Sequence, residues 1–487
     1  MKLVLAVIDG AKPEMVERAI ATGQAPALAE IAARGSGIHA CTAAFPSVTP
    51  VCAATIATGV RQDRHHIPAM NWWSRAERRY IEYGSSFAAA RRFGINRQLV
   101  DTVYNMNAEH LAADARTVFE ALDAEDVRTA GTTYLMYRGL HTHEPAREFA
   151  LSRIASATLF RRPVQGPREL FYADLFASRA TGCWSQLGLP GMRDQHAGCV
   201  GAYLVEHDLF DFLLLSLPDN DTHSHKHGPH AQVASIAAAD RQIERVMHAA
   251  GGTDAFLEEH AVIVVSDHSH APVEEEIAFV DAFGAWDVAA PTRPGRVRPE
   301  RAEIAMCPSQ RAAMIYVLLE EGREAAIGPL VEAAGELDGV DLVLWRDGEE
   351  GVIASARGEL RFAPGDDVRD RRGVGWTVRG DLEVLRAAAS GGEIDMPTYP
   401  DGLARAWAAL TCPTSGDVLL SAEPDYEFPD WGGVAHMGGG SHGSLHRVDS
   451  EGVLLMAGID PPPDRADGDT WSLVDVAPMA VSHFLRR

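Results

Sequence analysis

Carboxylate and imidazole side chains follow directly after apolar runs at three points in the sequence. They are Asp9 after 3–8, Asp221 and His225 after 209–217, and Asp267 with His268 after 260–266. His442, in the glycine-rich stretch 438–443, adds a further imidazole. Oxygen and nitrogen donors of these types suit zinc, with manganese or iron as alternatives. Together they are enough for two divalent ions, a pair of which can hold the attacking and leaving oxygens of a displacement at phosphorus.

The spacing of Asp221 and His225 suits two ligands of one ion. They are four residues apart, so one helical step puts both on the same face, with about 5–6 Å between their Cβ atoms. A solvated polar loop is the alternative for this segment. That alternative is our interpretation of the neighbouring imidazoles His223, His227 and His230.

The other two carboxylates depend on how their strands end. Adjacent residues point to opposite faces within a strand, so Asp267 and His268 reach one site only if the strand ends at Ser266. Asp9 precedes Gly10, which permits a sharp turn. Asp is also common as a helix cap, and this is the alternative role for Asp9.

Thr49 is the candidate nucleophile. It precedes Pro50, as expected of a residue that opens a helix with Pro in its first turn. A helix N-terminus can hold a phosphoryl oxygen, and a metal on the hydroxyl would lower its pKa and supply an alkoxide. The alternative is that Thr49 only caps the helix.

Short apolar runs that alternate with longer amphipathic stretches must position these residues. We expect strands at 2–8, 210–217, 260–266, 312–319, 416–421 and 452–457. Helices are expected at 12–34, 49–58, 108–124, 230–250, 324–336 and 475–486. The pattern predicts an α/β protein with a mainly parallel central sheet flanked by helices. Ligands of such sheets bind beyond the carboxyl ends of the strands, where the candidate donors lie.

Two regions fit the alternation poorly, and we interpret them as insertions. The catalytic core is predicted to comprise 1–59, 197–280 and 411–487. Residues 60–196, rich in Arg, Trp and Tyr, would form insertion or cap elements. Residues 281–410 would form a second insertion that includes a small α/β sublobe at 312–347.

The charge balance excludes one class of partner. The chain of 487 residues carries 44 Lys and Arg against 68 Asp and Glu, a net charge of −24. This field repels polyanions, so we expect a small-molecule partner and no polymeric nucleic acid. None of these features predicts an oligomeric state.

The cysteines and the apolar runs bear on location. The six cysteines are scattered without a C-x-x-C pair, so we expect thiols in a reducing compartment. The N-terminal apolar run is too short for a signal peptide, and no run approaches the ~18 apolar residues of a membrane span. We therefore expect a cytoplasmic protein without a membrane partner.

Taken in order, these motifs resemble the alkaline phosphatase superfamily, specifically its type I phosphodiesterase/nucleotide pyrophosphatase family. The resemblance rests on Asp9-Gly10, on Thr49 nine residues before Thr58-Gly59, on His65 with Ile67, on Asp221, His225, Gly228 and Pro229, on Asp267-His268, and on Gly440-Ser441-His442-Gly443. It implies an alkaline phosphatase-like fold and does not cover the cap.

The resemblance also implies roles for these residues. Asp9, Thr49, Asp267 and His268 would hold one metal, and Asp221, His225 and His442 the other. Thr49 would attack phosphorus and form a covalent phospho-threonine, which water at the second metal would release.

The sequence departs from the family pattern at several positions. Ser224, Ser269 and His66 each replace a glycine. Cys52 stands where phosphodiesterase members often carry an Asn that donates to the phosphate, and a thiol is a poor donor. Asn71 or a backbone amide is the candidate replacement.

The nucleophile segment favours a diester or pyrophosphate, because no Arg or Lys lies between Thr49 and Thr58. Trp72 and Trp73 could stack on a base or enclose an apolar leaving group, or be part of the core of the cap. Phosphonate, phosphomonoester or sulfate ester hydrolysis at the same site is the alternative reaction, although Thr49 does not match a sulfatase signature. An inactive metal-binding or interaction protein is the alternative of another class.

Overall fold

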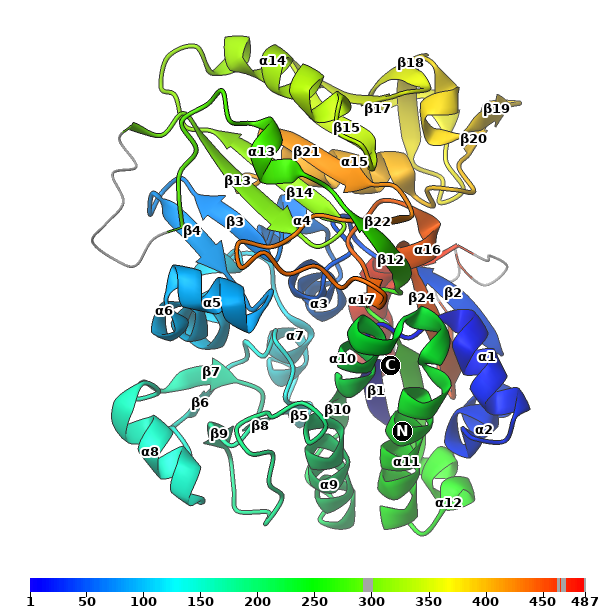
Figure 1. Ribbon diagram of the computed structural model, residues 1–487. Coiled ribbons are helices and arrows are strands. Elements are labelled where there is room, and N and C mark those ends of the chain that lie inside the picture. Colours follow the sequence, from blue (N-terminus) through cyan, green and yellow to red (C-terminus); the bar gives the residue numbers. More distant parts are fainter. Residues whose placement is uncertain (292–300, 462–464, 466–469, 486–487) are drawn as a thin grey trace.

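The computed structural model describes residues 1–291, 301–461, 465 and 470–485. Two nine-stranded sheets lie one above the other in Figure 1, with the N-terminal strand in the lower one. We refer to the lower sheet as the central sheet and to the upper one as the second sheet. In order across the central sheet, its strands are β25 (Trp471–Ser472), β2 (Ile38–Thr42), β24 (Glu451–Ala457), β11 (His260–Val265), β1 (Lys2–Ile8), β10 (Phe212–Leu217), β5 (Thr129–Thr132), β8 (Glu169–Tyr172) and β9 (Phe176–Ala177).

The middle of the central sheet is parallel. β1 pairs in parallel with β10 and β11, so that Ile8 lies opposite Leu217 and Val7 opposite Val265. These strands are nearly continuous apolar runs because both faces of the sheet are covered. The register brings the residues that follow the three strands to one edge. Nearer one side, β24 runs antiparallel to β11 and β2, so the sheet is mixed.

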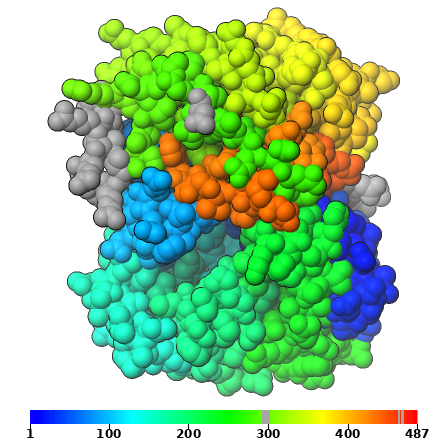
Figure 2. Space-filling model, in the orientation of Figure 1, coloured from blue at the N-terminus to red at the C-terminus, as the bar shows by residue number. Residues whose placement is uncertain are grey.

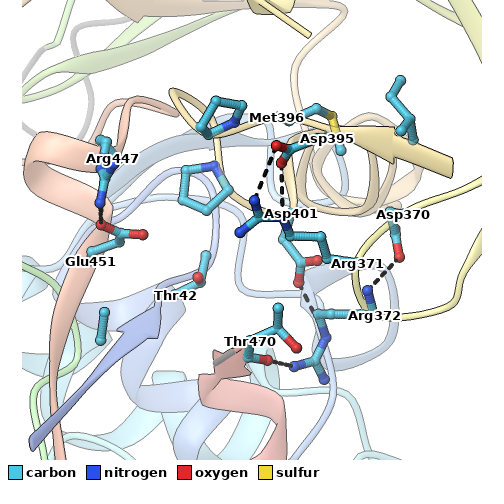
Figure 3. A pocket seen from close by; sticks show the side chains of 14 residues that line it. Thr42, Asp370, Arg371, Arg372, Asp395, Met396, Asp401, Arg447, Glu451 and Thr470 are labelled. Atoms are coloured by element: carbon cyan, nitrogen blue, oxygen red, sulfur yellow. Dashed lines mark hydrogen bonds and ion pairs between the residues drawn. The ribbon is translucent and has the colours of Figure 1, made fainter. Parts of the chain in front are cut away.

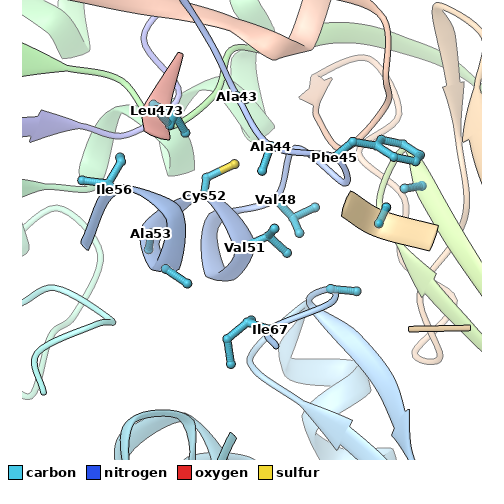
Figure 4. Packing of buried hydrophobic residues seen from close by; sticks show 14 of the residues in the cluster. Ala43, Ala44, Phe45, Val48, Val51, Cys52, Ala53, Ile56, Ile67 and Leu473 are labelled. Atoms are coloured by element: carbon cyan, nitrogen blue, oxygen red, sulfur yellow. The ribbon is translucent and has the colours of Figure 1, made fainter. Parts of the chain in front are cut away.

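Alternate residues of β1 enter two different cores. Val4, Ala6 and Ile8 pack with α1 (Pro13–Ala21), α2 (Pro26–Arg34), α9 (Arg193–Glu206), α11 (Val233–Ala249) and α12 (Thr253–Glu259). Leu3, Leu5 and Val7 pack with α3 (Thr49–Thr58), α7 (Val118–Asp123) and α17 (Val476–Leu485). The helix α3 is buried along almost its whole length, and Figure 4 shows apolar side chains around it. The helix that begins at Thr49 is therefore buried against the sheet.

The second sheet is mostly antiparallel. It contains β13 (Ile304–Ser309), β14 (Ala312–Val317), β21 (Val418–Ala422), β15 (Val340–Asp347), β16 (Glu350–Ser355), β17 (Gly358–Arg369), β18 (Gly375–Gly380), β20 (Glu393–Asp395) and β19 (Ala388–Ser390). α14 (Arg323–Gly335) packs on one face of this sheet. α15 (Gly402–Thr411) packs on the other face, within the same core that surrounds α3. The two sheets therefore share a hydrophobic core.

Several shorter α-helices and strands are also present in the described chain. They are α4 (Gln62–His65), α5 (Phe87–Phe93), α6 (Ile95–Val100), α8 (Ala150–Thr158), α10 (Asp219–His227), α13 (Phe279–Ala282) and α16 (Arg447–Ser450), with the hairpins β3 (Asn71–Ser74)–β4 (Arg79–Glu82) and β6 (His141–His143)–β7 (Val164–Gly166). A small sheet joins β22 (Asp425–Glu427), β12 (Ala271–Glu276) and β23 (Gly440–Ser441). Figure 2 shows the segment around residue 430, in orange, crossing the face of the molecule.

Several expected elements differ from the structure. The helix expected at 12–34 breaks into α1 and α2, because Gly23 adopts a positive φ of 70° and Pro26 starts a new helix. The region 108–124 holds the end of a π-helical segment, Asp101–His110, and the short helix α7. The helix expected at 475–486 is α17; residue 486 lies outside the described residues.

Several strands belong to a different sheet from the one that the expected domains implied. The strand expected at 416–421, within the predicted core, is β21 and pairs with β14 and β15 of the second sheet. The strand–helix–strand unit at 312–347 exists as β14, α14 and β15, but its strands belong to this larger sheet. Three strands of the central sheet, β5, β8 and β9, come from 60–196, the region expected to form insertion or cap elements. The division into a core and two insertions remains a prediction.

The expectation of unpaired cysteines is wrong at one pair. Cys183 and Cys199 form a disulfide, which links the segment before α9 to that helix. Their separation of 16 residues has no C-x-x-C signature, and only the fold brings them together. Disulfides persist mainly in oxidising compartments, so this bond argues against the cytoplasmic location that we predicted. Among the described helices, none combines the length and the apolarity that a membrane crossing needs.

Candidate metal centre

The ends of β1 and β11 bring one group of donors together with Thr49. His268 Nε2 lies 3.4 Å from Asp9 Oδ1, 3.4 Å from Asp267 Oδ2 and 3.2 Å from Thr49 Oγ1. The strand β11 ends at Val265, one residue earlier than expected, and the turn that follows lets Asp267 and His268 face one site. Gly10 has a φ of 68°, and its amide donates to Asp267 Oδ1 at 3.2 Å. We call Asp9, Thr49, Asp267 and His268 the oxygen-rich half.

A second group surrounds one oxygen of Asp221. Its Oδ1 lies 3.3 Å from His225 Nε2, 3.5 Å from His442 Nε2 and 3.0 Å from His270 Nε2. Asp221 and His225 are on the helix α10, as their spacing predicted, so the solvated loop is not formed there. We call these four residues the nitrogen-rich half. The rings of His268 and His442 stack with centroids 3.5 Å apart, which makes the two halves neighbours.

The two alternative capping roles are not found. Thr49 is the first residue of α3, and the preceding residue Val48 occupies the cap position. The Thr49 hydroxyl instead faces His268. Lys12 precedes α1, so Asp9 does not cap that helix either. Both side chains are therefore available to the donor cluster.

Three imidazoles are oriented by backbone carbonyl groups. The Nδ1 atoms of His225, His268 and His442 lie 2.8, 3.1 and 2.8 Å from the carbonyl oxygens of Gly440, Ser269 and Ser47. A carbonyl oxygen only accepts, so each Nδ1 carries the proton and donates it. Each Nε2 faces a carboxylate, and in a neutral ring it carries the lone pair that could bind a metal ion. Metal-binding histidines in proteins are oriented by this same kind of contact.

Two acceptor atoms of the cluster are left without a hydrogen-bond partner among the described residues. Asp9 Oδ1 and His442 Nε2 are buried without a hydrogen-bond partner within the described part of the chain. Two sets of donor atoms lie close enough to share an ion: Asp9, Asp267 and His268, and Asp221, His268, His270 and His442. This chemistry of orphaned oxygen and nitrogen acceptors fits a divalent metal.

The charges of the cluster point the same way. Burial, together with the nearby Asp267 and Asp221 carboxylates, raises the pKa of Asp9 well above its usual value. Burial also raises the pKa of Asp267. Burial would likewise raise the pKa of Asp221, but His225, His270 and His442 hold it well below the usual value. Burial and repulsion thus disfavour the ionised carboxylates of the oxygen-rich half, and a bound cation would offset that cost.

Several residues that support the site were missed at the sequence level. Buried Lys12 donates from Nζ to Ser269 Oγ at 3.1 Å, to the His270 carbonyl at 3.0 Å and to the Val448 carbonyl at 2.9 Å. Gln232 Nε2 donates to the Gly10 carbonyl at 2.7 Å and to Ser224 Oγ at 2.9 Å. These partners are far apart in the sequence, so no local signal exists. His270 could have been found, because it lies two residues after His268 at the same strand end.

The other histidines of this segment, His223, His227 and His230, lie outside the cluster, as expected. His223 Nε2 is 3.1 Å from the Ala231 carbonyl, and its ring packs against that of His227. His230 is exposed.

The predicted substrate contacts are more dispersed. Cys52 is fully buried among apolar side chains of α3 and its neighbours (Figure 4), and burial raises the pKa of its thiol well above the usual value. The Asn71 side-chain amide donates to the Ile81 carbonyl at 3.0 Å. Trp72 and Trp73 line a cavity of about 1000 Å³ together with Arg75 and His110. That lining includes none of the seven predicted metal ligands. A role in substrate binding remains a prediction for all four residues.

A smaller cavity of about 120 Å³ is lined by residues from β2 and from the β17–β20 region. Its arginines are neutralised by near neighbours: Arg372 pairs with Asp475, Arg371 with Asp395 and Arg447 with Glu451. Figure 3 shows the last two of these pairs. The arginines around this cavity therefore belong to structural ion pairs.

Comparisons with known proteins identify a family and similar folds. The model of the type I phosphodiesterase / nucleotide pyrophosphatase family matches residues 3–325. Among solved structures, phosphonoacetate hydrolase from Sinorhizobium meliloti 1021, in complex with phosphonoformate or phosphonoacetate, is similar at a TM-score of 0.57 and 16% identity, over 99% of this chain and 95% of that one. Human ectonucleotide pyrophosphatase/phosphodiesterase 5 is similar at a TM-score of 0.56 and 12% identity, over 100% and 95%. No curated protein matches the sequence.

Proposed function

Because this chain belongs to the type I phosphodiesterase/nucleotide pyrophosphatase family and is thereby a phosphoric ester hydrolase, we propose that it cleaves a small phosphodiester or nucleotide pyrophosphate through Thr49. The observation that carries the proposal is the position of the Thr49 hydroxyl. It lies 3.2 Å from His268 Nε2, at the N-terminus of a buried helix and beside a cluster of possible metal ligands.

Two divalent ions would be held by this chain, zinc first and manganese or iron as alternatives. Asp9, Thr49, Asp267 and His268 would hold one, and Asp221, His225 and His442 the other. When bound, such ions lower the pKa of a hydroxyl and offset the charge that develops at phosphorus.

The residues of the chain supply the nucleophile and its orientation. Thr49 Oγ1 would form a bond to phosphorus, while the bond from phosphorus to the leaving oxygen breaks and that oxygen takes up a proton. Water would then cleave the phospho-threonine and restore the hydroxyl. The positive end of the α3 dipole favours the phosphoryl oxygens, so a backbone amide there is a candidate for the contact that Cys52 cannot supply.

The charge of the site favours a substrate with one negative charge on the reacting phosphorus. α3 carries no basic residue, and the cationic Lys12 is already bonded to three groups. A monoester dianion would lack the extra cationic contacts that it prefers. Phosphonate hydrolysis is the second candidate, because the phosphonoacetate hydrolase has a similar fold.

A substrate panel with added metal tests the proposal. Purified protein supplemented with zinc, manganese or iron would be assayed with bis-p-nitrophenyl phosphate, p-nitrophenyl phosphate and phosphonoacetate. We expect two bound metal ions and a kcat/KM for the diester about tenfold or more above that for the monoester, a difference of ~1.4 kcal/mol.

Two outcomes would contradict it. A preference for the phosphonate or the monoester would favour the alternative reaction. A protein that binds no metal and hydrolyses none of the three would be an interaction protein.

A further inference from the structure

We propose that His270 is a positioning residue that holds the Asp221 carboxylate in place for metal binding. This inference rests on the proposed function, since it takes the cluster to be a metal site. His270 lies outside the seven ligand positions that the family resemblance implied.

The first observation is a difference between His270 and the other imidazoles. His225, His268 and His442 each donate from Nδ1 to a carbonyl, so in their neutral rings Nε2 carries the lone pair. His270 Nδ1 is buried and, within the described residues, has no hydrogen-bond partner. No carbonyl therefore fixes its tautomer, and the proton is free to reside on Nε2.

The second observation is what that proton would face. His270 Nε2 lies 3.0 Å from Asp221 Oδ1, closer than His225 at 3.3 Å or His442 at 3.5 Å. A carboxylate only accepts, so a proton on His270 Nε2 would make this shortest of the three contacts. A donor of this kind fixes the orientation of a ligating carboxylate and leaves its remaining lone pairs for an ion.

The third observation is that the backbone fixes the ring. β12 begins directly after His270, and its pair Ala271–Ser441 places His270 beside His442. The cationic amine of Lys12 holds the His270 carbonyl at 3.0 Å. A Cβ on Gly10 would lie 2.6 Å from His270 Nε2, so the turn after β1 leaves room for this ring and for nothing more. The ring is fully buried.

These contacts predict how substitutions separate positioning from ligation. Removing a hydrogen-bond partner of a metal-binding side chain typically lowers the metal affinity by about 10–100-fold. We expect His270→Ala to weaken one of the two metal dissociation constants by that factor and to leave the other unchanged. His270→Gln places an N–H donor near the position of Nε2 but is a poor metal ligand, so it should restore most of the affinity.

The experiment measures metal affinity and ligand environment rather than turnover. Wild type, His270→Ala and His270→Gln would be titrated with zinc against a chelator and loaded with cobalt for visible spectra. The expected result is rescue by Gln with a cobalt spectrum like that of wild type. His260→Gln is the matched control, because His260 is also buried but bonds the Phe256 carbonyl at the opposite end of β11.

Other outcomes overturn the inference. If Gln is as weak as Ala and the cobalt spectrum changes, His270 is a metal ligand. If both variants bind like wild type, it has no role at the metal. Thermal unfolding with chelator present would show whether each variant is folded, and His270→Asn would replace a variant that is not. A wild type that binds no metal refutes the proposed function itself, whereas one that binds two ions without hydrolysing esters still tests His270.

Discussion

The two halves of the donor cluster are neighbours, yet they are built differently. The oxygen-rich half depends on β1, β11 and the start of α3, all in or against the central sheet. The nitrogen-rich half depends on α10 and on the pairing of β12 with β23. In the first, buried carboxylates repel one another and raise the pKa of Asp9. In the second, three rings surround a single carboxylate whose pKa is held low. The repulsion between carboxylates favours a cation in the oxygen-rich half, and the orientation of the imidazole rings favours one in the nitrogen-rich half.

The largest expected effect is on the reaction itself. Thr49→Ala should reduce kcat by about 10³-fold or more, because it removes the atom that bonds to phosphorus. Both metal ions should remain, since the carboxylates and imidazoles are untouched. Steady-state kinetics and metal analysis on the same sample would check this.

Thr49→Ser is the matched control, because it keeps the hydroxyl and should retain part of the activity. Undiminished turnover in Thr49→Ala would eliminate this nucleophile.

The next effect concerns the link between the second sheet and the nitrogen-rich half. Arg311 is fully buried and pairs with buried Asp449 at 3.0 Å, while its backbone amide donates to the His442 carbonyl. Arg311→Met should lower the free energy of unfolding by about 3–5 kcal/mol, because it leaves Asp449 as an unpaired buried charge. Denaturant titration would measure it.

Arg323→Met is its control. The Arg323 side chain is 49% exposed, and its partner Asp417 also pairs with Arg75, so the loss should be about 1 kcal/mol or less. Equal losses for the two arginines would contradict the special role of the buried pair.

The smallest effect compares the two halves without metal. The pKa of Asp9 is higher in the folded state than in the unfolded state. The folded state therefore binds more protons in the pH interval between these two pKa values. The metal-free protein should then lose stability as pH rises through it. Asp221 has the opposite shift, so its contribution is present above its unfolded pKa and is lost as pH falls.

With chelator at pH 7, Asp9→Asn should therefore raise Tm by about 2 °C, and Asp221→Asn should lower it by a similar amount. Scanning calorimetry at several pH values would measure both. Shifts of the same sign would remove the distinction between the halves.

Local patterns predicted the oxygen-rich half well. Asp9, Asp267 and His268 stand at the ends of apolar runs, and Thr49 precedes a proline, so each carries a signal within a few neighbouring residues. Parallel pairing then brings such ends together with no further information. The spacing of Asp221 and His225 was informative for the same reason, because residues four apart lie on the same face of a helix.

Features that depend on distant partners were not predicted. β21 resembles a core strand in composition, but its neighbours β14 and β15 lie far away in the sequence. The Cys183–Cys199 bond and the Lys12 contacts likewise depend on the completed fold. His270 fell between these cases: its position was visible, but its contact with Asp221 crosses 49 residues.

Two residue pairs join β12 to β23. Because this is backbone pairing, the distance between His270 and His442 does not depend on which exposed side chains lie nearby. Nearby changes are limited to exposed side chains such as Met437, because the His436 ring stacks on that of His225 with centroids 3.9 Å apart and a Cβ on Gly439 would lie 2.0 Å from the His225 carbonyl oxygen. The imidazoles would keep their separation as long as Ala271 stays opposite Ser441. The backbone pairing of β12 with β23 is therefore the feature that any redesign near the site must keep.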